Sequence, residues 1–231
     1  MFFYRQMNGA DGMGCFITFE GIEGCGKTTQ LKLLARRLTG IGYDAVATRE
    51  PGGCPIADQV RAILLDAENG GMAPLTELLL YAAARSQHMT EVVVPALEAG
   101  KIVLCDRFTD ATLAYQGYGR GLDRAAIDRL NSLATGDVRP DLTVLVDCSV
   151  EIGLRRARAR IDNTTGAREE RFELESLHFH RRVRDGYLEL AGREPDRFIV
   201  IDGSGGIEET ETAIAAAVLS RLSPGGADAV R

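Results

Sequence analysis

Short apolar runs alternate along the chain with longer stretches in which apolar residues recur every three to four positions. Short runs rich in Val, Ile, Leu and Phe are typical of strands buried on both faces of a parallel sheet. The longer stretches are typical of helices that cross over between such strands. The pattern predicts strands at Cys15–Phe19, Ala45–Thr48, Ile102–Asp106, Leu142–Asp147 and Phe198–Asp202.

The longer stretches predict the helices of an α/β fold. These helices are Lys27–Thr39, Pro55–Asp66, Pro74–Glu98, Arg124–Ala134, Val150–Arg160, Glu173–Leu190 and Ile207–Leu222. Residues 15–222 are expected to form a single domain, with a flexible N-terminal extension at 1–14 and a flexible tail at 223–231. The polar, turn-rich stretch 162–166 predicts a mobile loop between two helices that carry arginines.

Composition narrows the class of protein. The 231 residues include 27 basic and 33 acidic ones, a net charge of −6, which argues against a nucleic-acid-binding protein. No apolar run approaches the roughly 18–20 residues that a membrane-spanning helix needs, and the N-terminus does not resemble a signal peptide. Five cysteines without a C-x-x-C pair favour a reducing compartment. We therefore expect a cytoplasmic protein that acts on small molecules.

Residues 21–28 read G-I-E-G-C-G-K-T and match the phosphate-binding pattern G-x-x-x-x-G-K-[ST]. Glycines let backbone N–H groups surround phosphate oxygens, Lys27 adds a positive charge, and Thr28 can bind Mg²⁺. An apolar strand precedes this loop and an amphipathic helix follows it, as in the three-layer α/β/α fold of P-loop NTPases. The predicted nucleoside-triphosphate site consists of Gly21, Ile22, Glu23, Gly24, Cys25, Gly26, Lys27, Thr28 and Thr29.

Other polar residues follow the predicted strands. Asp106 and Arg107 end the third one, where a carboxylate can hold Mg²⁺ and an arginine can bind a second phosphate, or where the two simply form an ion pair. Arg49 ends the second strand. Glu23 is unusual among phosphate-binding amides, which suggests contact with a hydroxyl of a second substrate; a solvated loop residue is the alternative.

Two residues spaced one helical turn apart also suggest a binding site for a planar base. Tyr81 and Arg85 are four positions apart and share a face, where they either stack on a base or pack together. Thr112 and Gln116 offer hydrogen-bonding groups that can read a base edge. Arg156, Arg158 and Arg160 precede the predicted loop and either form a solvated helix face or bind the triphosphate from a mobile lid at about 155–172.

Six ordered motifs resemble bacterial thymidylate kinases. They are F-E-G-x-E-G-x-G-K-T-T-Q, T-R-E-P-G-G, Y-A-A-A-R, D-R-F…A-Y-Q-G, R-P-D-L-T and R-A-R-A-R, and the resemblance runs from about Phe16 to Leu222. It implies ATP-dependent phosphorylation of dTMP to dTDP with Mg²⁺, a five-stranded parallel sheet with a mobile lid, and a homodimer. The resemblance also implies that the protein binds dTMP and ATP as small-molecule partners, and that it binds neither nucleic acid nor a membrane.

The resemblance also implies residue roles. Tyr81 stacks on thymine, Arg85 contacts its carbonyl edge, Thr112 and Gln116 read the base, and Tyr115 lies beneath the deoxyribose. Glu23 lies near the 3′-hydroxyl. The monophosphate is held by Arg49, Arg61 and Arg107, and the transferring phosphate by Arg160 with Arg156 and Arg158. The catalytic set is therefore Lys27, Asp106, Arg107 and Arg160, with Thr28 and Asp106 holding the metal.

The sequence departs from the family pattern at several positions. Tyr81 stands where Phe is commoner, Phe108 replaces a usual Tyr or His, and the predicted lid is longer than in many relatives. Two rival functions stay open on residues alone. A kinase for dUMP or dCMP is one, because the carboxamide of Gln116 can present either a donor or an acceptor. The other is a regulatory ATPase, which hydrolyses ATP without an acceptor.

Overall fold

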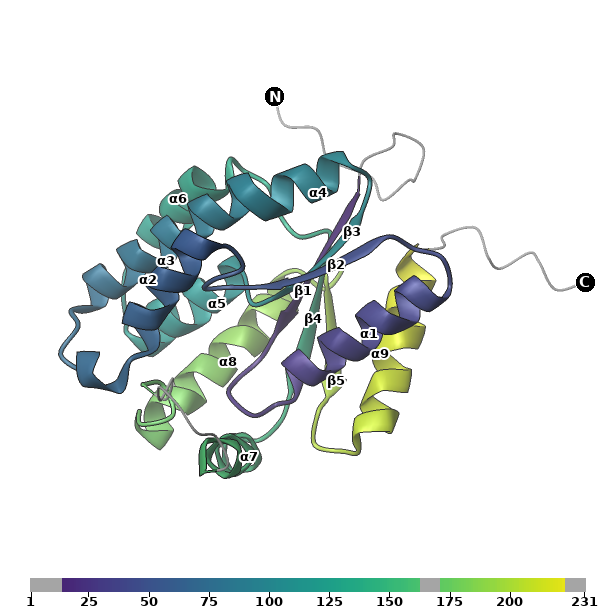
Figure 1. Cartoon of the computed structure of the whole chain (residues 1–231). Helices are drawn as coiled ribbons and strands as arrows, with labels where there is room; N and C mark the ends of the chain where they lie inside the picture. The colour runs from purple at the N-terminus through teal and green to yellow at the C-terminus, as the bar shows by residue number, and fades with distance from the viewer. Residues whose placement is uncertain (1–13, 163–170, 223–231) are drawn as a thin grey trace, which may run out of the picture.

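The computed structural model describes residues 14–162 and 171–222, and Figure 1 shows their arrangement. Five strands form one parallel sheet in the order β2-β3-β1-β4-β5. Their bounds are Cys15–Glu20 (β1), Ala45–Arg49 (β2), Ile102–Asp106 (β3), Leu142–Asp147 (β4) and Phe198–Asp202 (β5). All ladders are parallel, so the carboxyl ends of the five strands lie at one edge of the sheet.

The sheet lies between two layers of helices (Figure 1). α1 (Lys27–Gly40) and α9 (Ile207–Leu222) pack together on one face. The opposite layer holds α3 (Pro74–His88), η2 (Met89–Val93), α4 (Val94–Glu98), α5 (Thr109–Thr112), η3 (Leu113–Gly119), α6 (Arg124–Thr135) and α8 (Leu177–Arg193). α2 (Pro55–Leu65) packs against α3, the short η1 (Ala67–Asn69) follows it, and α7 (Val150–Asp162) follows β4.

The buried side chains explain this layering. The main core runs from β1 and β4 to α1 on one side and to η3 and α8 on the other. A second cluster places Phe16 and Val103 against η2 and α4, where Met89 and Val93 are almost completely buried. Burial on both faces is what the apolar strand pattern requires. Within the two described ranges, no helix is long and apolar enough to cross a bilayer.

All five predicted strands are confirmed, β1 and β2 being one residue longer than expected, and the parallel three-layer fold is confirmed. The helix predicted from Glu173 is wrong at its start. Residues 171–174 form turns, and α8 begins at Leu177, because the Ser176 side chain accepts a hydrogen bond from the Phe179 N–H and caps the helix there.

Two π-helical segments were not predicted. Met89–Val93 interrupts the single helix expected at 74–98, and Leu113–Gly119 continues a helix that the sequence did not suggest. Glycines and β-branched residues make residues 109–119 poor helix formers, so tertiary burial stabilises this segment instead. The predicted mobile loop falls mainly on residues 163–170, and the flexible ends on 1–13 and 223–231. These residues lie outside the described part of the chain.

Candidate active site

The phosphate loop connects β1 to α1 at the carboxyl edge of the sheet (Figure 1). Gly24 has φ +69°, and a Cβ there would lie 1.9 Å from the carbonyl oxygen of Gly153, so the loop requires glycine at this position. Lys27 begins α1 and is buried, with Nζ donating to the Ile22 carbonyl oxygen at 3.2 Å. The loop therefore holds a cation at a helix N-terminus, which suits a polyphosphate.

Two oxygen donors lie together beside this loop. The Thr28 hydroxyl on α1 donates to Oδ2 of Asp106 at the end of β3. Hydroxyl and carboxylate oxygens are the ligands that Mg²⁺ prefers, usually completed by water and substrate phosphates. The pair fits the predicted metal position, although among the described residues no group of three or more His, Cys, Asp and Glu side chains forms a metal cluster.

Glu23 turns inward from the phosphate loop. Its Oε1 accepts hydrogen bonds from Nη2 of Arg107, at 3.0 Å, and from the Tyr115 hydroxyl. His180 Nδ1 on α8 lies 3.3 Å from its Oε2. Burial acts to raise the pKa of Glu23, but His180, Arg107, Lys27 and Tyr115 outweigh it and hold that pKa well below its usual range. The phosphate loop thus holds an ionised carboxylate against Arg107, which follows β3.

Arg107 connects the phosphate loop to the opposite helical layer. It has φ +71°, a left-handed conformation that is uncommon outside glycine, and its N–H donates to the Phe19 carbonyl. Its guanidinium lies 4.7 Å from the centre of the Tyr115 ring, and Nη1 donates to the Tyr187 hydroxyl at 3.1 Å. The unusual backbone conformation directs the side chain across the top of the sheet towards Glu23.

Glu20, beneath this cluster, is completely buried. It accepts hydrogen bonds of 2.7 Å from the Phe108 N–H and the Tyr187 hydroxyl. Burial, followed by the nearby charge of Asp110, raises the pKa of Glu20 to about 7 from its ordinary 4.5, although Arg107 and the two hydrogen bonds act against this change. Glu20 is therefore a buried group that titrates near neutral pH.

Glu20→Gln is expected to flatten the pH dependence of stability. A carboxyl whose pKa is raised by folding stabilises the folded state fully below pH 4.5 and loses this contribution as pH rises to about 7. Between pH 5 and pH 8 the free energy of unfolding of the wild type should fall by about 2–3 kcal/mol through this group, whereas the variant should not show this fall. Urea denaturation at both pH values measures this change, with Glu98→Gln, an exposed glutamate at the end of α4, as control. Equal losses in wild type and Glu20→Gln would contradict the assignment.

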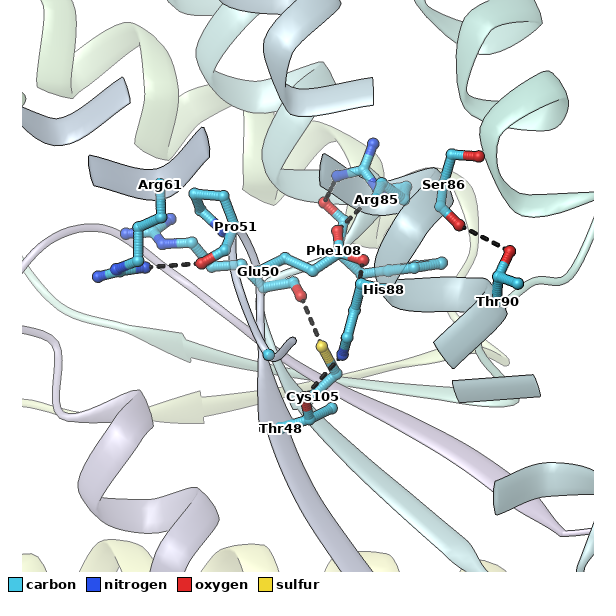
Figure 2. Close-up of polar contacts among 12 residues, drawn as sticks. Thr48, Glu50, Pro51, Arg61, Arg85, Ser86, His88, Thr90, Cys105 and Phe108 are labelled. Atoms are coloured by element: carbon cyan, nitrogen blue, oxygen red, sulfur yellow. Dashed lines mark hydrogen bonds and ion pairs between the residues drawn. The ribbon is translucent and has the colours of Figure 1, made fainter. Parts of the chain in front are cut away.

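Arg85 on α3 is buried at the centre of a polar network. Nε donates to Oε2 of Glu50 at 2.7 Å, Nη1 to Oδ1 of Asn131 at 2.7 Å, and Nη2 to the Phe108 carbonyl and the Thr112 hydroxyl, each at 3.0 Å. His88 completes the group: Nδ1 lies 3.0 Å from Oε1 of Glu50, and Nε2 2.7 Å from Oγ1 of Thr48 (Figure 2). Arg85 is thus rigidly oriented.

Two more arginines lie on either side of the segment 50–54, at the end of β2 and on α2. Arg49 is the register partner of Asp106, and its Nη2 pairs with Asp58 at 2.9 Å. Arg61 on α2 donates to the Pro51 carbonyl at 3.0 Å (Figure 2). Gly52, with φ +118°, leaves room for these side chains, since a Cβ there would lie 2.5 Å from Oδ1 of Asp58, 3.3 Å from Nε of Arg49 and 3.5 Å from Cδ of Arg61.

Tyr81 lies on α3 and Gln116 on η3, and a hydrogen bond of Gln116 connects the two elements. Tyr81 is half-buried, and burial raises the pKa of its hydroxyl. Gln116 is almost completely buried, and its Nε2 donates to Oε1 of Glu77 on α3 at 2.8 Å. The predicted base-binding residues Tyr81, Arg85, Thr112 and Gln116, and Tyr115 expected beneath the sugar, thus lie on three elements, α3, α5 and η3.

The arginines of α7, which the sequence assigned to the lid, do not share one environment. Arg156 donates to the Gly203 and Ser204 carbonyls, at 2.7 and 3.0 Å, in the loop after β5. Arg158 is exposed. Arg160 belongs to α7, but its side chain lies outside the described residues, so its predicted role stays a prediction.

Several polar residues of the site escaped the sequence analysis. Glu50 and Asn131 accept hydrogen bonds from Arg85, and His88 contacts Glu50. His180 and Tyr187 reach the phosphate-loop cluster from α8. Tyr187 lies 167 residues from its hydrogen-bond partner Glu20, and no local pattern signals such a contact. Glu77 is the exception: it lies four positions before Tyr81, so helical spacing alone places it on the same face of α3.

Comparison with known proteins decides the family. Residues 19–214 match the family model described as thymidylate kinase, which is most of the chain. The chain belongs to the thymidylate kinase family. It is therefore a nucleoside monophosphate kinase, and both the resemblance and the enzyme class expected from the sequence are confirmed.

Individual thymidylate kinases are similar over nearly their whole length. The one from Geotalea uraniireducens (strain Rf4) is 71% identical over 213 residues, covering 92% of this chain and 100% of the relative. That from Geobacter sulfurreducens is 65% identical over 210 residues, covering 91% and 99%. The crystal structure of thymidylate kinase from Ehrlichia chaffeensis, 37% identical, superposes with a TM-score of 0.72 and covers 89% and 99%.

Proposed function

We propose that this thymidylate kinase family member transfers the γ-phosphoryl group of ATP directly to the phosphate of dTMP, giving dTDP and ADP. The observation that carries the proposal is the contact of Glu23 with Arg107 and Tyr115. Glu23 belongs to the phosphate loop, whereas Arg107 and Tyr115 belong to the proposed dTMP site. The two sites therefore share a wall, and two phosphates bound there would lie next to each other.

The proposed mechanism depends on positioning and charge. The dTMP phosphate is already an ionised nucleophile, so the transfer needs no general base. Arg107, with Arg49 and Arg61 nearby, would hold this phosphate, and Lys27 would neutralise the β- and γ-phosphates of ATP. Arg160, Arg156 and Arg158 remain the proposed contacts to the transferring group from the lid side.

The metal fits the same scheme. Thr28 and Asp106 would hold Mg²⁺, which when bound neutralises charge on the phosphate oxygens. Glu23 would accept a hydrogen bond from the 3′-hydroxyl. Tyr115, packed edge-on against Phe172 with ring centres 5.3 Å apart, would limit the space beneath the sugar and disfavour a ribose. The homodimer expected from the resemblance stays a prediction.

A coupled assay of ADP release tests the proposal. With ATP and Mg²⁺ present, adding dTMP should raise ADP release by at least about a hundredfold, because water is a poor acceptor in a closed phosphoryl-transfer site. Comparing dTMP, dUMP, dCMP and UMP at matched concentrations identifies the acceptor. ADP release that does not depend on any monophosphate would instead support the regulatory ATPase.

A further inference from the structure

The carboxamide of Gln116 has two chemically different ends. Its oxygen accepts hydrogen bonds and its nitrogen donates them, so the end that faces the protein decides which end is left for a ligand. Gln116 is almost completely buried, in η3, and its Nε2 lies 2.8 Å from Oε1 of Glu77. The state of Glu77 therefore determines how Gln116 can read a base.

Glu77 can only accept hydrogen bonds. It is 1% exposed, and Oε1 and Oε2 each lie 3.2 Å from a nitrogen of Arg120, while Nη1 of Arg171 lies 2.6 Å from Oε2. Burial acts to raise the pKa of Glu77, but the hydrogen bonds of Arg120 and Gln116 and the charges of both arginines outweigh it and lower that pKa. An ionised carboxylate has no proton to give, so the NH₂ group of Gln116 must face it.

A second contact orients the neighbouring hydroxyl. Nη2 of Arg85 donates to Oγ1 of Thr112 at 3.0 Å. Because Oγ1 of Thr112 already accepts a hydrogen bond from Arg85, the hydroxyl hydrogen of Thr112 has to point to a different acceptor. The base-reading pair therefore combines a carbonyl oxygen on Gln116, which accepts, with a hydroxyl on Thr112, which can donate.

Thymine and uracil complement this combination, whereas cytosine does not. Thymine presents an N3–H donor beside the O4 acceptor, while cytosine presents an N3 acceptor beside an N4–H₂ donor. Rejection of the wrong pattern is strong in such sites because buried polar groups are left unpaired. The ambiguity of the Gln116 carboxamide, which left a dCMP kinase open on sequence alone, is removed by its neighbour.

We propose that Glu77 is a positioning residue for pyrimidine specificity: it fixes the Gln116 carboxamide with its oxygen towards the base, so that the site selects a ring N3–H and excludes cytosine. The inference rests on the proposed function, in which Thr112 and Gln116 read the base of the acceptor. The arrangement is built into one helix face, since Glu77, Tyr81 and Arg85 follow one another at four-residue spacing on α3.

Glu77→Gln tests the proposal with a change of almost no volume. An amide at position 77 can turn its oxygen to the two arginines and its NH₂ to Gln116, which can then present its own NH₂ to the base. The ratio of kcat/KM for dCMP to that for dTMP is expected to rise about tenfold or more, the cost of about one misread base contact. Calorimetric Kd values for the two monophosphates should change in the same direction.

The matched control is Glu175→Gln. Glu175 accepts a hydrogen bond from Arg120, the same arginine that pairs with Glu77, but Gln116 is not among its partners in the described structure. The same chemical change there loosens the arginine network without touching the carboxamide, so the dCMP to dTMP ratio should stay within twofold of wild type. An equal rise in both variants would overturn the proposal, because it would assign the effect to the arginines.

A second variant keeps the test decisive if Glu77→Gln does not fold. Glu77→Asp retains the charge for Arg120 and Arg171 but withdraws the acceptor from Gln116, and the same ratio should rise, by less. Unchanged ratios in the folded variants would overturn the proposal. Failure of the proposed function is a separate result: the wild type would then release no ADP with dTMP, whereas the calorimetric preference for dTMP over dCMP still reports on Gln116.

Discussion

Lys27→Ala is expected to lower kcat for phosphoryl transfer to dTMP by about 10²–10³, the usual cost of one preorganised group that stabilises transition-state charge. Lys27 is buried at the start of α1, and its Nζ is already held by the Ile22 carbonyl, so no reorganisation is needed when phosphates bind. Water that enters the vacated space cannot supply a fixed charge. Steady-state kinetics with saturating ATP and dTMP measure the loss.

The control for this variant is Lys32→Ala, a lysine exposed on the same helix. It should leave kcat within about twofold of wild type, since an exposed charge outside the site is largely screened. The Kd for dTMP should change little in either variant, because Lys27 acts on the other nucleotide. A Lys27→Ala enzyme that keeps near-normal kcat would contradict both the phosphate-loop assignment and the proposed mechanism.

Arg85→Met is expected to destabilise the protein by about 3–5 kcal/mol, because it leaves the buried Glu50 carboxylate without its cation. Arg85 and Glu50 are 2% and 4% exposed, and Asn131, Phe108 and Thr112 would each lose a hydrogen-bond donor as well. Urea denaturation measures the change. The variant should also bind dTMP more weakly, because Thr112 loses the contact that orients it.

A surface ion pair provides the contrast. Arg193 pairs with Glu189 across one turn of α8, with side chains 58% and 44% exposed, and Arg193→Met should cost no more than about 1 kcal/mol. Adding Glu50→Gln to Arg85→Met should restore part of the lost stability, since the unpaired charge is then gone. A loss below about 1 kcal/mol for Arg85→Met alone would show that Glu50 does not depend on this arginine.

Local patterns predicted the parts of this fold that depend on local physics. Apolar runs located the central strands β1, β3 and β4 because both of their faces are buried, and the glycine spacing located the phosphate loop because its backbone tolerates little else. The π-helical turn at Met89–Val93 escaped detection, since its hydrophobic pattern resembles that of the α-helix on either side. Capping by Ser176 was also overlooked, although Ser before a helical run is a local signal.

The supporting residues of the site could not be found in the same way. Arg85 and Thr112 were recognised as candidates for binding a base, but the partners of Arg85 come from three distant segments. Glu50 lies in the loop after β2, Phe108 in the loop before α5, and Asn131 on α6. In the sequence, a glutamate that neutralises a buried arginine cannot be distinguished from a glutamate on the surface. Only the packing of α3 against α6 and the start of α5 distinguishes them.

The order of the strands affects how the chain reaches its native state. β1, which carries the phosphate loop, occupies the middle of the sheet, and its neighbours β3 and β4 come much later in the sequence. The hydrogen bond from Phe16 to Asp141 alone closes a separation of 125 residues. Such a high contact order slows folding, and during synthesis the nucleotide cradle leaves the ribosome early but acquires both flanking strands only after more than half the chain has followed.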